Sequence, residues 1–98
     1  MPKAYIIANI TVTDPDQYAT YRAGTPAAIA RHGGRFLVRG GTIHPLEGAL
    51  DLDRLVVIEF PSLDAAQTFY RSPEYEPLRQ LREAATRSDL AIVEGVAD

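Results

Sequence analysis

The stretch FLVRGGTIHPLEGALDLDRLVVIEFPSLDAAQTFYRSPEYEPLRQLR, residues 36–82, decides the fold. It contains most of one short strand, a complete second strand, the loop between them and two helical segments. Residues 54–60 (RLVVIEF) are apolar and β-branched and predict a buried strand. Residues 35–39 (RFLVR) predict a shorter strand before it. Residues 40–53 contain a proline and three glycines and predict a long loop, which is a candidate functional segment.

Two helices are expected after the strand at residues 54–60. Ser62 can accept a backbone N–H bond and predicts the N-cap of a helix that extends through Tyr70. Residues 72–74 (SPE) combine a capping serine, a proline suited to the first helical position and an early acid, so a second helix is expected to begin there. Tyr75 and Arg82 are spaced to lie on the same face of this second helix.

Strands at both ends of the chain complete the order β-α-β-β-α-β. Residues 4–12 (AYIIANITV) and residues 90–96 (LAIVEGV) predict the first and last strands. This order is typical of the ferredoxin-like fold, a four-stranded antiparallel sheet with its helices on one face. We therefore expect residues 1–98 to form a single α+β domain.

The first helix is predicted to be capped and kinked. Asp14 can cap its N-terminus, and Pro15 suits the first helical position because its missing N–H would have no partner there. Pro26 cannot donate a hydrogen bond to the carbonyl of Arg22, so a kink is expected near residues 24–25.

The face of the sheet opposite the helices is expected to pair with a second copy of the chain. Leu55 and Val57 alternate toward one face of their strand, and Val56 and Ile58 toward the other, so both faces are apolar. Monomers rarely expose a large apolar patch, and we therefore predict a homodimer that buries this face.

Composition excludes several classes of function. The net charge is −3, with nine scattered arginines and one lysine, which argues against a nucleic-acid partner. The chain has no cysteine, which excludes disulfides, thiol catalysis and Cys-ligated metals. No signal-peptide pattern or membrane-length apolar run is present, so we expect a cytoplasmic protein without a membrane partner.

Several motifs together carry a resemblance to a known family. They are HGGRFLVRGG at 32–41, the pair at 47–48, RLVVIEFPS at 54–62, AxxFYRSPEY at 66–75 and VEG at 93–95. The chain resembles the bacterial family catalogued as domain of unknown function 1330, a branch of the dimeric α/β-barrel superfamily. A Trp frequent in that family before the Tyr of the fourth motif is Phe69 here. The resemblance implies a ferredoxin-like protomer that pairs into a barrel, and it implies no established activity.

Arg39 and Glu59 are the first candidates for a functional site. Each is a charged residue in an otherwise apolar strand, where burial is costly unless the charge is paired. By strand alternation Arg39 shares a face with Arg35 and Leu37. The two residues form either a structural ion pair at the rim or a ligand site, in which Arg39 orients a carboxylate or carbonyl and Glu59 acts as a base.

The remaining candidates lie on the first strand, in the long loop and on the helices. Asn9 is a ligand-binding candidate in the first strand, and Tyr18, Tyr75 and Arg82 could form aromatic walls and an edge of a pocket. His44, in the long loop, is a second catalytic candidate, although lone loop histidines are mostly solvated.

No cofactor or metal is expected. The two histidines lack metal-ligand spacing, and the glycines at 40–41 are not followed by a helix that could bind phosphate.

Two functions remain open from sequence. One is a non-catalytic dimer that binds a small organic ligand in a cleft between sheet and helices. The other is a cofactor-independent enzyme, monooxygenase- or isomerase-like, for which fold analogy supplies most of the support. The residues show no nucleophile with a base and an orienting group, which weakens the enzyme hypothesis.

Overall fold

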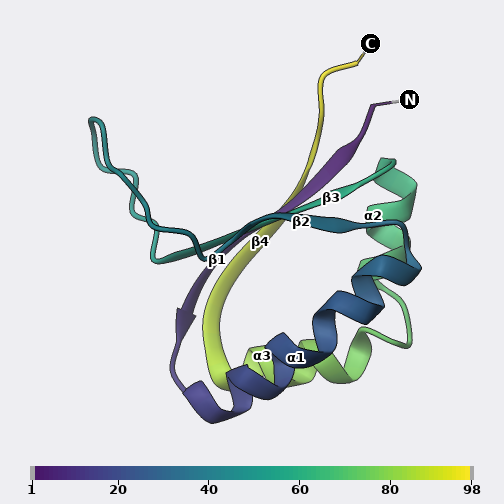
Figure 1. Ribbon diagram of the computed structural model, residues 1–98, viewed down its shortest axis with the longest axis horizontal. Helices are drawn as coiled ribbons and strands as arrows, with labels where there is room; N and C mark the ends of the chain where they lie inside the picture. The colour runs from purple at the N-terminus through teal and green to yellow at the C-terminus, as the bar shows by residue number, and fades with distance from the viewer. Residues whose placement is uncertain (1, 98) are drawn as a thin grey trace.

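The computed structural model describes residues 2–97 as one curved sheet with three helices against it (Figure 1). Four strands and three helices follow one another in the predicted order. Two separate helices, as expected, connect the third strand to the fourth. The elements are β1 (Ala4–Val12), α1 (Pro15–Arg31), β2 (Arg35–Arg39), β3 (Arg54–Phe60), α2 (Leu63–Tyr70), α3 (Glu76–Ala85) and β4 (Thr86–Glu94).

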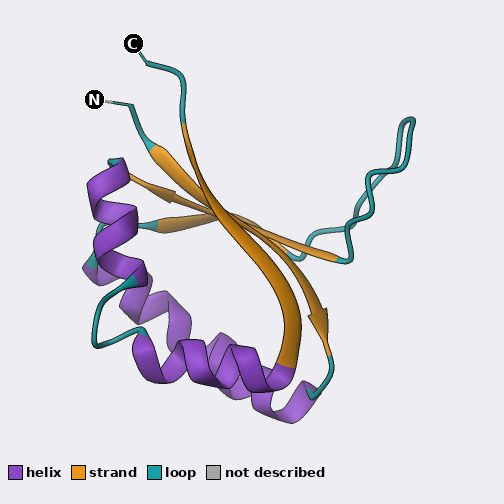
Figure 2. Cartoon of the chain, turned by 180° about the vertical axis from the view of Figure 1, so that it is seen from behind, coloured by secondary structure: helices purple, strands orange, loops and turns teal. Residues whose placement is uncertain are grey.

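The sheet has the ferredoxin-like order β2-β3-β1-β4 with every neighbouring pair antiparallel. All three helices cover the same face, as Figure 2 shows from behind. Alternation in β1 points Ile6 and Ile10 into the core beneath the helices and Ile7 to the open face. Ile7, Leu37 and Val93 on the strands are 38%, 45% and 47% exposed, so part of the apolar surface of the sheet is not covered by this chain.

α1 begins as predicted and continues through its proline. The side chain of Asp14 accepts a hydrogen bond from the amide of Gln17, and Pro15 occupies the first turn. The helix is continuous across residues 24–25, so any bend at Pro26 does not end it. It stops at His32, where Gly33 follows with φ +77°, a conformation that favours glycine.

The bounds of two predicted elements were wrong. Residues 73–75 form a separate turn, and α3 begins only at Glu76. The hydroxyl of Ser72 accepts from the amide of Tyr75, so the serine caps that turn and not α3. The last strand begins at Thr86 and ends at Glu94, not at residues 90–96, because its polar first half pairs in register with the end of β1.

Residues 40–53 form an irregular arm that projects away from the sheet and helices (Figure 1). The arm is attached at its base by Asn9, whose Nδ2 donates to the carbonyl of Asp51 (3.2 Å) and whose Oδ1 accepts from the amide of Asp53 (2.8 Å). Leu46 and Leu50 on the arm are exposed. Within residues 2–97, no helix combines the length and the apolar character needed to cross a membrane.

Candidate functional site

A cavity lies between the helix-facing side of the sheet and all three helices. The space open to the centre of a water-sized sphere is about 30 Å³, which suffices for one or two water molecules. Its walls are mainly apolar and aromatic, with a few polar groups among them. The lining residues are Ile6, Ala8, Ile10, Tyr18, Tyr21, Arg22, Thr25, Ile29, Phe36, Arg39, Val56, Ile58, Phe69, Tyr70, Tyr75, Arg82 and Leu90.

A bulge in β2 turns Arg39 toward this cavity. Phe36 pairs with Ile58, but Val38 pairs with Val57, so the register shifts by one residue between them. The extra residue reverses the alternation, and Arg39 lies on the helix side with its guanidinium 4.3 Å from the centre of the Phe36 ring. The expectation that Arg39 shares a face with Arg35 was therefore wrong, since strict alternation takes no account of a bulge.

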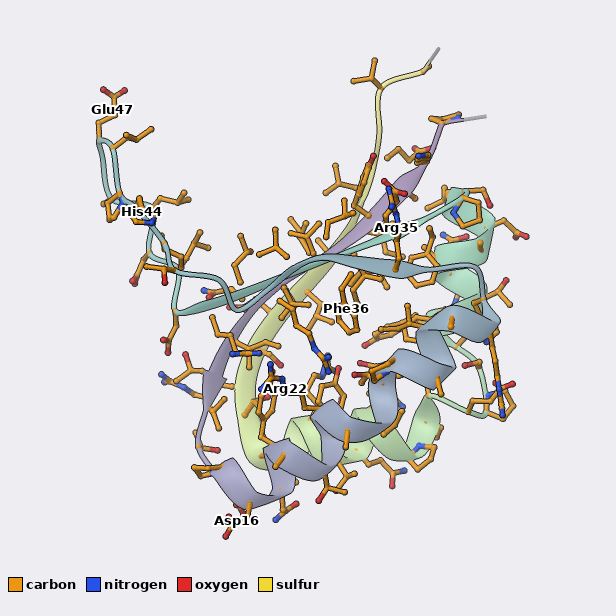
Figure 3. The ribbon with its side chains drawn as sticks, in the orientation of Figure 1. Asp16, Arg22, Arg35, Phe36, His44 and Glu47 are labelled. Atoms are coloured by element: carbon orange, nitrogen blue, oxygen red, sulfur yellow. The ribbon has the colours of Figure 1, made fainter. Side chains whose placement is uncertain are left out.

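Pro26 leaves free the backbone carbonyl that accepts a hydrogen bond from Arg39. Because proline has no N–H, the carbonyl of Arg22 receives no bond from residue 26 in the helix. That carbonyl instead accepts from Arg39 Nη2 at 2.6 Å and from the hydroxyl of Thr25 at 3.2 Å. The same Arg39 nitrogen lies 3.4 Å from Thr25 Oγ1. In Figure 3, Arg22 and Phe36 extend into the space between α1 and the sheet.

Tyrosine hydroxyls form the second polar group of the cavity. The hydroxyls of Tyr21 and Tyr75 lie 2.9 Å apart and hydrogen-bond to each other. Burial raises the pKa of both phenols, so both are neutral at physiological pH. Nearer the end of the sheet, Arg54 Nε donates to the Tyr18 hydroxyl at 2.9 Å.

Arg82 is the most unusual side chain of the cavity. It projects from α3 and is only 3% exposed. Its Nε and Nη1 are buried without any hydrogen-bond partner, and no salt bridge to Arg82 is found within residues 2–97. An unpaired buried ion costs on the order of several kcal/mol. The neighbouring residue Arg79 forms salt bridges with Glu76 and Glu83 instead.

The cavity is therefore electropositive. Arg22, Arg39 and Arg82 line it, and Arg54 lies beside it on Tyr18. Among the described residues of its lining, none is an acid or a histidine. Burial, followed by the charge of Arg22, lowers the pKa of Arg39 below its usual value, which indicates positive charges crowded together.

Three of these side chains separate the cavity from the surface. Tyr18, Arg22 and Arg39 line both the cavity and an open hollow of about 510 Å³ beside α1. Val12 at the end of β1 and residues of α1 between Pro15 and Pro26 form the remainder of the hollow. A rotamer change of Arg39 or Tyr18 would join the two spaces.

The structure brings Tyr18, Arg39, Tyr75 and Arg82 together and places three other predicted residues elsewhere. Glu59 is on the open face, where its Oε1 lies 3.0 Å from Arg35 Nε and 3.4 Å from Lys3 Nζ. Asn9 holds the base of the arm. His44 is exposed on that arm, away from the cavity (Figure 3). Arg39 and Glu59 do not form a pair.

Partial desolvation raises the pKa of Glu59, but hydrogen bonds and charges outweigh this effect. The contributions of Arg35 and then Lys3 hold the pKa of this carboxyl below its usual value. The sequence left open whether Glu59 forms a structural ion pair or a ligand site. Its geometry is that of a structural ion pair, and its partner is Arg35 and not Arg39.

Sequence reasoning missed Tyr21, Arg22 and Thr25. Tyr21 follows Tyr18 by one helical turn, and this spacing is a signal that could have placed it on the cavity wall. The role of the Arg22 carbonyl also had a signal, because Pro26 lies four residues later. No group of three or more metal-ligating side chains gathers anywhere in the described part of the chain.

Comparison with known proteins gives a family and a fold. The model of the family named "Domain of unknown function (DUF1330)" matches residues 3–96. A comparison with curated protein sequences gives no significant match.

Among solved structures, RPA0582 from Rhodopseudomonas palustris, a protein of unknown function, has a TM-score of 0.78 at 20% identity, covering 99% of this chain and 85% of its own. SnoaB from Streptomyces nogalater, a cofactor-independent oxygenase, has a TM-score of 0.65 at 21% identity, covering 100% and 97%. A putative antibiotic biosynthesis monooxygenase from Nitrosomonas europaea has a TM-score of 0.54 at 14% identity, covering 98% and 93%. At these identities the likeness establishes the fold alone, a ferredoxin-like α+β protomer. Since the family model spans nearly the whole sequence, the chain belongs to the DUF1330 family.

Proposed function

We propose that this protein binds a small organic ligand in the cavity between sheet and helices and does so as a homodimer. The observation that carries the proposal is the lining of that cavity: apolar and aromatic walls on which a few polar groups converge. Ligand sites in proteins have this composition, whereas an ordinary core excludes charged groups. The hollow outside Tyr18 and Arg39 supplies a route of entry. Once a rotation of these side chains joins it to the cavity, it also supplies the volume that an organic ligand needs beyond the space for one or two waters.

Binding is favoured over catalysis by what the cavity contains. Acid–base catalysis needs a group that changes protonation near neutral pH. The described lining offers only arginines and tyrosines, and burial keeps Tyr21 and Tyr75 protonated. The catalytic candidates Glu59 and His44 lie outside the cavity.

An enzyme remains the second candidate, because the fold is shared with SnoaB, a cofactor-independent oxygenase. Incubating any ligand with the protein in air and analysing it by mass spectrometry separates the two. A product formed with the wild type and lost in the Arg39→Ala variant would favour the enzyme.

The test of binding is a screen of phenols, lactones, quinones and carboxylates by two-dimensional NMR on labelled protein. We expect a binder to shift the amide signals of cavity residues such as Ala8 and Phe69. Ala8→Val fills part of the cavity and is expected to weaken binding, whereas Ala27→Val on the exposed side of α1 is not. The proposal fails if no compound binds at millimolar concentration, or if binding is indifferent to Ala8→Val.

A further inference from the structure

We propose that the ligand is a small organic acid, a monocarboxylate with an apolar body, and that Arg82 binds its carboxylate. This inference rests on the ligand-binding function proposed above and specifies the chemical class of the ligand. It assigns to Arg82 a role as the anchor of the cavity.

The burial of Arg82 carries the argument. Arg82 lines the cavity at 3% exposure, and two of its three guanidinium nitrogens have no acceptor among residues 2–97. A guanidinium has five N–H donors, and a carboxylate supplies the acceptors and the opposite charge in one group. No described acid lines the cavity, so the protein itself does not supply that group. A charge buried in this way is compensated when an anion enters.

The tyrosine pair next to Arg82 offers a further donor. Tyr21 and Tyr75 share one hydrogen bond, but two hydroxyl protons are present, so one O–H is free to donate to a ligand oxygen. The charge of Arg82 acts on both phenols and lowers the pKa of each against the larger effect of burial. Guanidinium and hydroxyls thus converge on one end of the cavity.

The other arginines differ from Arg82 in burial and in hydrogen bonding, which makes Arg82 the anchor for a single carboxylate. Arg39 already donates to the carbonyl of Arg22, and Arg54 to the hydroxyl of Tyr18. Arg22 is exposed, so solvent satisfies its charge. Arg54 also has a buried Nη2 without a partner, but it is not part of the cavity lining. Arg82 is the one buried arginine of the described lining and matches one carboxylate, and the walls of Phe36 and other apolar side chains match a hydrocarbon body and not a phosphate.

Benzoate is a suitable probe because benzamide has nearly the same shape without the charge. We expect calorimetry on the full chain at neutral pH to detect benzoate, with benzamide about tenfold to a hundredfold weaker, the range for a charge-assisted hydrogen bond. Inorganic phosphate is the third arm, and we expect it to bind more weakly than benzoate.

Two variants test the role of Arg82. Arg82→Met keeps the length of the side chain and is expected to abolish the preference for benzoate over benzamide. It is also expected to raise the melting temperature of the unliganded protein, because an unpaired buried charge is removed. Arg71→Met removes the same charge from an exposed position outside the cavity and is expected to change neither property.

Each alternative result overturns the assignment in a distinguishable way. Equal affinity for benzoate and benzamide, both sensitive to Ala8→Val, would leave the ligand-binding function standing and refute the carboxylate class. Phosphate binding as tightly as benzoate would indicate an inorganic-anion site. A lower melting temperature for unliganded Arg82→Met would show that Arg82 is structural. If neither aromatic probe binds, the carboxylate assignment fails, and the wider NMR screen decides the function by itself.

Discussion

Glu59 is a charged residue in an apolar strand whose charge is paired on the open face of the sheet and not in the cavity. It lies on the open face between Arg35 and Lys3, and its pKa is held below the usual value near 4.3. A lowered pKa in the folded state means that the carboxylate contributes stability above the unfolded pKa, and that this contribution disappears as the pH falls through the folded pKa.

We therefore expect Glu59→Gln to lower the free energy of unfolding at neutral pH, and the difference from the wild type to shrink toward zero at an acid pH below the folded-state pKa. Urea denaturation at the two pH values measures it. Glu47→Gln on the exposed arm is the matched control and is expected to have no effect. A difference that persists in acid would contradict an electrostatic role for Glu59.

The roles of individual residues were predictable where the role follows from the strand or helix alone. Tyr18 and Tyr75 were expected to form aromatic walls of a pocket, and Arg82 was expected near Tyr75 from its spacing; all three line the cavity. The absence of a partner for Arg82 had no sequence signal, because it depends on how α3 packs against α1 and the sheet. The pairing of Glu59 with Arg35 depends likewise on the register between β2 and β3.

At the level of elements, strongly patterned segments were predicted well and irregular ones were not. β1 and β3 have the predicted bounds because apolar, β-branched runs specify both period and length. β4 was misplaced because its polar half is defined by pairing with β1. The bulge in β2 could not be predicted, since the short strand gives no period long enough to reveal one extra residue.

Pro26 is predicted to lower the stability of α1 and, by leaving the Arg22 carbonyl free, to hold the side chain of Arg39 in place. In Pro26→Ala, the new N–H would compete for the Arg22 carbonyl, which already accepts from Arg39 and Thr25. Removing a proline from a helix interior raises the free energy of unfolding by up to about 3 kcal/mol, and loss of the Arg39 hydrogen bond lowers it by about 1 kcal/mol. We expect unfolding free energy to rise by about 2 kcal/mol in urea titrations.

The same variant is expected to release the Arg39 side chain. NMR hydrogen exchange at the Arg39 guanidinium should then become faster. Pro77→Ala is the control, because Pro77 lies in the first turn of α3, where a backbone N–H has no helical acceptor. If Pro26→Ala stabilises the protein but leaves hydrogen exchange at the Arg39 guanidinium unchanged, the Arg22 carbonyl accepts from both Arg39 and the new backbone N–H, and the predicted competition is refuted.

At the scale of the whole molecule, the two faces of the sheet differ in what covers them. The helix side buries the core and the electropositive cavity, although the net charge of the chain is −3. The open side keeps apolar side chains on three strands without cover from this chain, among them Ile7 in the middle of β1 between Val57 and Ala91. A second copy would provide the matching apolar surface that our dimer prediction requires, because a two-fold interface places the same patch against itself.

We expect size-exclusion chromatography with light scattering to give twice the chain mass of 10.7 kDa for the wild type and 10.7 kDa for Ile7→Lys. A lysine at the centre of the open face would be buried without a partner in the dimer, which disfavours association. Ala27→Lys adds the same charge on the exposed side of α1 and is expected to remain dimeric. A wild-type monomer at micromolar concentration would refute the dimer, and a dimeric Ile7→Lys would move its interface to another surface. Because the cavity opens on the helix side, near α1, we further expect monomeric Ile7→Lys to retain ligand binding.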